Sequence, residues 1–170
     1  LGFDVRPFGV TPDGRNINLD CGSTHLASLS RAVVASGARL GIAFDGDGDR
    51  ALFVDASGQV VDGDAVLLIA ALHLQQEGRL PGDAVVATVM SNIGLEMALR
   101  AHGIGLVRAA VGDKYVMEEM VNRGAALGGE QSGHIIFTDH LPTGDGLATA
   151  LNLLRIMAQS GRELADLAGE

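Results

Sequence analysis

This sequence has few basic residues compared with its acidic ones. Its 170 residues include 21 Asp and Glu but only 12 Lys and Arg, which gives a formal net charge of -9. The only lysine is Lys114. Proteins that bind duplex nucleic acid or an anionic membrane surface use clustered basic side chains. The sequence therefore predicts neither a nucleic-acid partner nor a membrane partner.

Cysteine and long hydrophobic runs are scarce as well. The single cysteine, Cys21, excludes an internal disulfide framework and is typical of a reducing compartment. No apolar run approaches the ~20 residues that cross a bilayer, since the longest, residues 65–74, has the size of a buried helix and contains His73. The N-terminus has neither a signal-peptide pattern nor a methionine. We therefore expect a cytoplasmic protein and interpret the sequence as a piece of a longer chain.

Glycine, in contrast, is abundant. The sequence has 24 glycines, where average usage gives roughly 12. Many of them fall in three clusters with polar side chains, at residues 45–49, 128–133 and 143–146. Glycine is favoured where a loop needs a positive φ or where a ligand must approach the backbone. These clusters are therefore the first candidates for functional loops.

Strand and helix patterns alternate between these clusters. The patterns predict strands at 40–44, 51–54, 84–89, 106–109, into Gly129 and at 134–138, and helices around 26–33, at 64–76, 93–102 and 114–123, and from about 147 to 158. This order is typical of an α/β fold with mixed, largely parallel sheets flanked by helices. The turn-forming residues 56–58 mark the expected domain junction.

Asp45, Asp47 and Asp49 alternate with glycine between two predicted strands. Three carboxylates this close repel one another unless a positive charge lies among them, and their hard oxygens suit Mg²⁺, Mn²⁺ or Ca²⁺. An EF-hand is excluded, because the places that need Gly and Glu hold Arg50 and Ala56. The alternative is a solvated acidic turn. Arg50 favours a functional loop, since a guanidinium there can hold a phosphate that also touches the metal.

The segment Phe44–Arg50, FDGDGDR, resembles the metal-binding loop of the α-D-phosphohexomutases. Members of that family move a phosphoryl group between the 1 and 6 positions of a hexose phosphate by way of an active-site phosphoserine. The resemblance implies that Asp45, Asp47 and Asp49 bind Mg²⁺, with a phosphoserine oxygen as a further ligand. It also implies that Arg50 is a catalytic residue that helps to hold the phosphate.

The segment Gly129–His134, GEQSGH, is similar to the sugar-binding loop of the same family, which implies that Glu130 and Ser132 bind the substrate. A carboxylate and a hydroxyl on a flexible loop can bond neighbouring sugar hydroxyls in two flipped poses. Taken alone, both side chains have the alternative of being solvated. His134 has two interpretations of equal weight: a catalytic proton shuttle, or a residue that orients the loop by hydrogen bonds.

Lys114 lies in the segment Val111–Tyr115, VGDKY, which follows a predicted strand and opens a predicted helix. Taken alone, Lys114 is an ordinary surface lysine and Asp113 an ordinary N-cap. The family has a lysine in the matching loop, so the resemblance implies a catalytic Lys114. Near the reacting sugar oxygens, it would neutralise phosphate charge or assist proton transfer.

The segment Asn18–His25, NLDCGSTH, with GDKYV and GEQSGH, resembles the phosphoglucosamine mutase branch of the family. This implies a hexosamine phosphate substrate, with glucosamine 6-phosphate and glucosamine 1-phosphate interconverted. Segment 143–146 also matches, and its simplest role is to cap the last long helix. The alternatives are a phosphomannomutase or phosphoglucomutase, a metal-dependent sugar phosphatase, and a non-catalytic module that binds a metal and a sugar phosphate.

The resemblance runs along the whole chain and implies the middle of a four-domain enzyme. Residues 1–57 are expected to be the C-terminal part of the second domain, which ends with the metal-binding loop. Residues 58–170 are expected to be the third domain, with the sugar-binding loop. The family's nucleophilic serine lies in its first domain and its main phosphate-binding loop in its fourth. We therefore expect the chain to be inactive without domains 1 and 4 as its partners.

Overall fold

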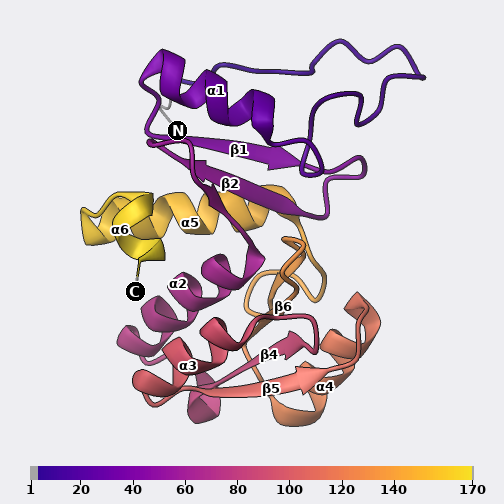
Figure 1. Cartoon of the computed structure of the whole chain (residues 1–170). Coiled ribbons are helices and arrows are strands. Elements are labelled where there is room, and N and C mark those ends of the chain that lie inside the picture. Colours follow the sequence, from indigo (N-terminus) through magenta and orange to yellow (C-terminus); the bar gives the residue numbers. More distant parts are fainter. Residues whose placement is uncertain (1–3, 170) are drawn as a thin grey trace.

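The computed structural model describes residues 4–169, which form two sheets and the helices that cover them (Figure 1). The first sheet is an antiparallel meander of three strands, β1 (Leu40–Phe44), β2 (Ala51–Asp55) and β3 (Val60–Val61). Helix α1 (Ala27–Ser36) covers one face of this sheet, and helix α5 (Gly146–Ser160) lies against the other (Figure 1). Because Phe44 pairs with Ala51 across the hairpin, residues 45–50 form the loop that joins β1 to β2. This loop carries the three aspartates and is called the acidic loop below.

The second sheet has four strands in the order β5-β4-β6-β7. They are β4 (Ala84–Thr88), β5 (Gly105–Ala109), β6 (Leu127–Gly129) and β7 (Ile135–Phe137). Strands β4, β5 and β6 are parallel and β7 is antiparallel to β6. The flanking helices are α2 (Gly63–Gln76), α3 (Ile93–Ala101) and α4 (Asp113–Arg123). The α/β class is therefore confirmed, with a mixed, mostly parallel second sheet flanked by helices, whereas the first sheet is antiparallel throughout.

Helices cover both faces of β4, which is why this strand is apolar from Ala84 to Ala87. Val85 and Ala87 pack into the core with α2 and α3, whereas Val86 belongs to a smaller core with Val116 and Met120 of α4. Successive side chains of a strand point to opposite faces, so a continuous apolar run serves two helical layers.

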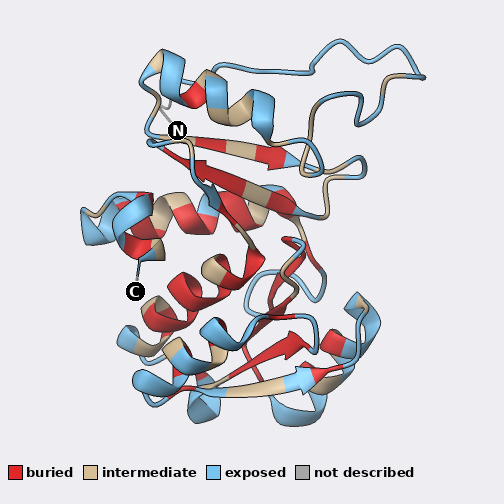
Figure 2. Ribbon diagram, viewed as in Figure 1, coloured by how far each residue is buried: buried red, intermediate tan, exposed pale blue. Residues whose placement is uncertain are grey.

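One large core joins the two sheets. Its members include Phe53 from the first sheet, Leu67 from α2, Leu127 from the second sheet and Leu153 from α5, each at most 2% exposed. Figure 2 shows this buried layer as a red band through α2 and α5, which lie between the sheets. The acidic loop and the second sheet are consequently held in one framework.

Several short elements of the structure were not predicted from the sequence. The two-residue strand β3, the short helix α6 (Leu164–Ala168) and the 3-10 turn η1 (Pro81–Asp83) carry too few residues for a periodicity to reveal them. Among the described residues, no helix is both long and apolar enough to cross a membrane.

Candidate functional site

The loops singled out by glycine and charge lie at one edge of the second sheet and beside the first hairpin. Residues 110–112 follow β5 and residues 130–134 follow β6, so both loops leave the carboxyl ends of parallel strands. This edge is where open α/β sheets place their ligands. The segment 130–134 then turns back into β7 and, on the way, contacts the acidic loop of the first sheet.

The acidic loop brings three carboxylates together. One oxygen each of Asp45, Asp47 and Asp49 lies within 4.8 Å of the other two. Asp45 Oδ1 accepts hydrogen bonds from the backbone N–H groups of Gly48 and Arg50, each at 3.1 Å, which curls the loop around this carboxylate. Gly48 has a φ of 77°, a conformation that glycine adopts at no steric cost.

The donor set of this loop fits a hard divalent cation. Asp49 Oδ1 is a buried oxygen that has no hydrogen-bond partner in the described part of the chain, which is costly unless a positive charge lies beside it. Arg50 supplies part of that charge, since its Nε lies 3.6 Å from Asp45 Oδ2 and 3.8 Å from Asp49 Oδ1. Asp47 is exposed, so a site formed by the three carboxylates is open to a further ligand from outside.

His134 is buried, with 3% of its surface exposed, and its Nδ1 lies 3.0 Å from Asp49 Oδ2. The ring packs so closely on Gly144 that a Cβ at that glycine would overlap with ring atoms. Its Nε2 is also buried. This environment supports the second interpretation of His134, a residue that orients by hydrogen bonds, because a proton shuttle needs a ring nitrogen within reach of the substrate.

Two glycines let other segments lie against the acidic loop, and the sequence patterns did not single out this role. Gly146 N–H donates to the carbonyl of Gly48 at 2.9 Å, and a Cβ at Gly146 would lie only 2.6 Å from the carbonyl oxygen of Arg50. Ala51 N–H donates to the carbonyl of Gly133 at 3.1 Å. The glycine clusters in the sequence were the signal that could have revealed these contacts, because glycine is favoured both at a positive φ and where another group comes close to the backbone.

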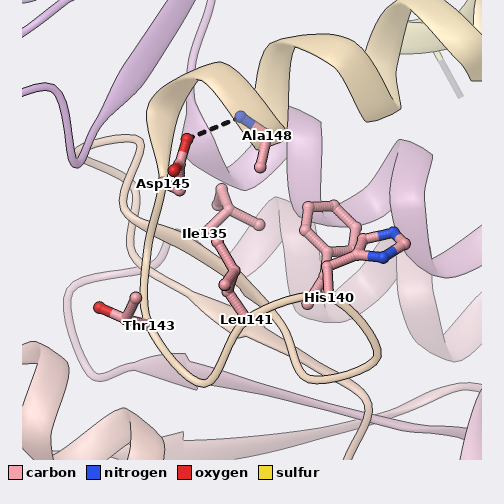
Figure 3. Close-up of a pocket in the computed structure, with 7 residues that line it drawn as sticks. Ile135, His140, Leu141, Thr143, Asp145 and Ala148 are labelled. Atoms are coloured by element: carbon pink, nitrogen blue, oxygen red, sulfur yellow. Dashed lines mark hydrogen bonds between the residues drawn. The ribbon is translucent and has the colours of Figure 1, made fainter.

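The pocket beside segment 143–146 is a packing feature (Figure 3). Asp145 accepts a hydrogen bond from Ala148 N–H at 2.8 Å, which confirms the expected N-cap of α5. The pocket, which His140 and Leu141 also line, has a volume of about 10 Å³, room for about one water molecule and not for a sugar.

Residues 129–134, the predicted sugar-binding loop (called the sugar loop below), hold the two predicted sugar ligands, Glu130 and Ser132, side by side. Ser132 Oγ donates to Glu130 Oε2 at 3.3 Å, and Glu130 Oε1 accepts a hydrogen bond from Gly112 N–H at 2.9 Å. The second bond joins this loop to the loop after β5. Ser132 is exposed and Glu130 half-buried, so both present polar atoms at the carboxyl edge of the sheet.

Lys114 is exposed in the first turn of α4, two residues after Gly112. Its Nζ lies 6.0 Å from the ring centroid of Tyr115. The alternative role for Asp113 as N-cap was wrong: Gly112 occupies the N-cap position and the Asp113 carboxylate bonds the N–H of Lys114. The bond from Gly112 to Glu130 places the Lys114 loop beside the sugar loop.

The segment around Asn18–His25 supports the acidic loop from the other side. Ser23 N–H donates to the carbonyl of Phe44 at 3.0 Å, directly before the first aspartate. Gly46 approaches Ile17 so closely that an added Cβ would lie 2.7 Å from Ile17 Cδ1. The segment therefore packs against the start of the acidic loop.

A buried carboxylate, that of Asp64, lies in the first turn of α2. Asp64 is 3% exposed, and its Oδ2 accepts hydrogen bonds from the backbone N–H and the side chain of Asn92, at 2.8 and 2.9 Å. Burial raises the pKa of Asp64, and the hydrogen bonds from Asn92 oppose this rise without cancelling it. Asp64 thus links α2 to the loop after β4.

Residues 62–170 match the family model of phosphoglucomutase/phosphomannomutase, alpha/beta/alpha domain III. The chain belongs to the phosphohexomutase family. Curated relatives named phosphoglucosamine mutase include those from Solibacter usitatus, 58% identical over 170 residues, and Moorella thermoacetica, 56% identical over 168 residues. They align with 100% and 99% of this chain, and the chain spans 38% of the length of each relative.

Solved phosphohexomutase structures share the fold. A phosphoglucomutase/phosphomannomutase family protein from Burkholderia thailandensis is 32% identical with a TM-score of 0.75, over 86% of this chain and 32% of that one. A putative phosphomannomutase from Thermus thermophilus is 28% identical with a TM-score of 0.77, over 86% of this chain and 33% of that one. The resemblance read from the acidic and sugar loops is therefore confirmed at the level of the family.

Proposed function

We propose that this chain is the central part of a cytoplasmic phosphoglucosamine mutase, which interconverts glucosamine 6-phosphate and glucosamine 1-phosphate. The observation that carries the proposal is the contact between the two predicted loops. The 3.0 Å contact of His134 with Asp49 joins a cluster of three carboxylates to a loop that displays Glu130 and Ser132. A metal and a sugar phosphate would then meet in one site. The names of the relatives, at 51–58% identity, support the hexosamine branch.

Mg²⁺ is the proposed metal, held by Asp45, Asp47 and Asp49. Carboxylate oxygens are the ligands that this ion prefers. In support, an N-acetylphosphoglucosamine mutase from Aspergillus fumigatus that shares the fold, with a TM-score of 0.70 at 20% identity, has been solved with GlcNAc-6P and magnesium. When bound, the cation would supply electrostatic stabilisation of the phosphoryl group in transfer.

The residues of this chain would then have separate roles in binding the sugar and its phosphate. Glu130 and Ser132 would orient the sugar by hydrogen bonds to its hydroxyls, and Arg50 would hold the phosphate beside Asp45 and Asp49, from which its Nε is less than 4 Å away. Lys114 would support the reacting end of the sugar from the adjacent loop.

The proposed protein is larger than this chain. Residues 1–57 would complete a second domain, residues 58–170 would form the third, and domains 1 and 4 of the same protein would supply the phosphoserine and the main phosphate-binding loop. The 38% coverage of the relatives supports a longer protein, because the aligned proteins are more than twice as long as this chain.

The experiment that tests the function assays the longer enzyme on glucosamine 6-phosphate with Mg²⁺ and a hexose bisphosphate primer. A mutase forms glucosamine 1-phosphate and releases no inorganic phosphate. Phosphate release in place of glucosamine 1-phosphate would identify a phosphatase. Binding of metal and sugar phosphate without either product would identify a non-catalytic module. Faster turnover of mannose or glucose 6-phosphate would move the assignment to the phosphomannomutase/phosphoglucomutase branch.

A further inference from the structure

Gln131 stands between the two predicted sugar ligands, but its side chain bonds to a different element. Its Nε2 donates a hydrogen bond to Asp62 Oδ2 at 3.1 Å. Its backbone carbonyl accepts a hydrogen bond from Gly63 N–H at 2.9 Å. The sugar loop is thus bonded twice to the residues at the start of α2, through one side chain and one backbone group.

Asp62 is already fixed by the helix when it accepts this bond. It is the N-cap of α2, where its Oδ1 accepts a hydrogen bond from Ala65 N–H at 3.1 Å. Helix α2 lies in the shared core with most of its residues buried, so its first turn is a rigid point of attachment. The two oxygens of one carboxylate therefore serve two purposes, one for the helix and one for the loop.

Gly63 allows the loop to lie directly on the helix. A Cβ at this position would overlap with the carbonyl oxygen of Glu130 and would lie 2.8 Å from the carbonyl oxygen of Gln131. Backbone atoms cannot turn away as the end of a flexible side chain can. Any larger residue at position 63 would therefore move the segment that carries the predicted sugar ligands.

We propose that Asp62 and Gln131 are a pair of positioning residues for the sugar-binding loop. Their bond holds the backbone on either side of Gln131, so that Glu130 and Ser132 keep the orientation in which they bond each other. Neither member of the pair touches the sugar. The inference rests on the proposed function, because it takes a hexosamine phosphate as the ligand of this loop.

A charge exchange between the two residues tests the proposal in the longer enzyme. In Gln131→Glu, a second carboxylate faces Asp62 and the bond becomes a repulsion. The double variant D62N/Q131E restores it, because an Asn at position 62 still caps α2 and its amide can donate to the new carboxylate. We expect the KM for glucosamine 6-phosphate to rise about tenfold in the single variant with little change in kcat, and to return to within about twofold in the double variant.

Amide hydrogen exchange in residues 130–133 of the same variants measures how firmly the loop is held, and it does not depend on turnover. Exchange should quicken in Gln131→Glu and slow again in the double variant. The matched control is Gln159→Glu, the same change at an exposed position of α5, which should alter neither exchange in the loop nor KM. If Gln131→Glu fails to fold, Gln131→Met, which removes the bond and keeps the size, replaces it in both measurements.

The outcomes separate this inference from the proposed function. Wild-type exchange in Gln131→Glu, or a double variant as impaired as the single one, would overturn the pair as an anchor; the second result would indicate that Gln131 acts on the sugar itself. If the enzyme turns over no hexosamine phosphate, the proposed function fails, while the exchange measurement still decides whether Asp62 and Gln131 hold the loop.

Discussion

Replacing Asp47 with Asn should change metal binding and metal-free stability in opposite directions. Asp47 is the exposed member of the carboxylate cluster and forms no ion pair with any of residues 4–169, whereas Arg50 lies within 4 Å of both Asp45 and Asp49. The substitution therefore removes one charged ligand from the proposed site and also removes two unfavourable charge pairs from the metal-free protein.

The sizes of the two effects follow from the geometry. Two unit charges at 4.8 Å, the limit that bounds the cluster, repel by about 0.9 kcal/mol in water. Removing Asp47 relieves two such pairs, and screening by salt reduces the gain to about 1 kcal/mol, or roughly 3 °C in Tm for a chain of this size. Affinity for Mg²⁺ should fall roughly 100-fold, since the affinity of carboxylate sites is set largely by ligand charge.

Two measurements on the 170-residue chain check this. Isothermal titration with MgCl₂ gives the affinity, and thermal unfolding in EDTA gives the metal-free stability, at low and at high salt. Asp4→Asn is the control, because Asp4 is exposed and outside the cluster. Unchanged Mg²⁺ affinity would refute the metal assignment. A loss of metal-free stability would refute the electrostatic argument, because it would show that the Asp47 carboxylate is stabilising.

Three further predictions concern the supports of the site. His134→Phe should lower Mg²⁺ affinity about tenfold by freeing Asp49, as loss of an outer partner does in other metal sites, and equal affinity in calorimetry would contradict it. Gly146→Ala should destabilise the fold by about 1–3 kcal/mol through its clash with a backbone carbonyl, measured by urea unfolding beside Gly105→Ala, where the nearest atom is 3.7 Å away. Because burial raises the pKa of Asp64 above 3.8, wild-type stability relative to Asp64→Asn is greatest below that pH and falls as the pH rises through the folded-state pKa. Parallel stability curves for the two proteins between about pH 4 and pH 7 would contradict this assignment.

Much of the fold and of the site was predictable from the sequence because the signals are local. Each long apolar strand and each amphipathic or buried helix has its own period, and the predicted segments agree with β1, β2, β4 and α2 to α5 within a few residues. The three aspartates lie within five consecutive residues, so their convergence needs only a tight, glycine-rich hairpin loop. Short elements such as β3 and α6 lack a readable period, and they were missed.

Only the tertiary structure decided which distant residues meet. Asp49 and His134 are 85 positions apart, and Asp62 and Gln131 are 69 apart, and nothing local in either segment names its partner. The burial of His134 follows from the packing of α5 and of residues 129–134 on the first hairpin, and this packing places the His134 ring against Asp49. The three closely spaced aspartates by themselves predict a place for a cation. The shared core decided that the three aspartates lie beside the loop predicted to bind sugar, because it holds the two sheets in one framework.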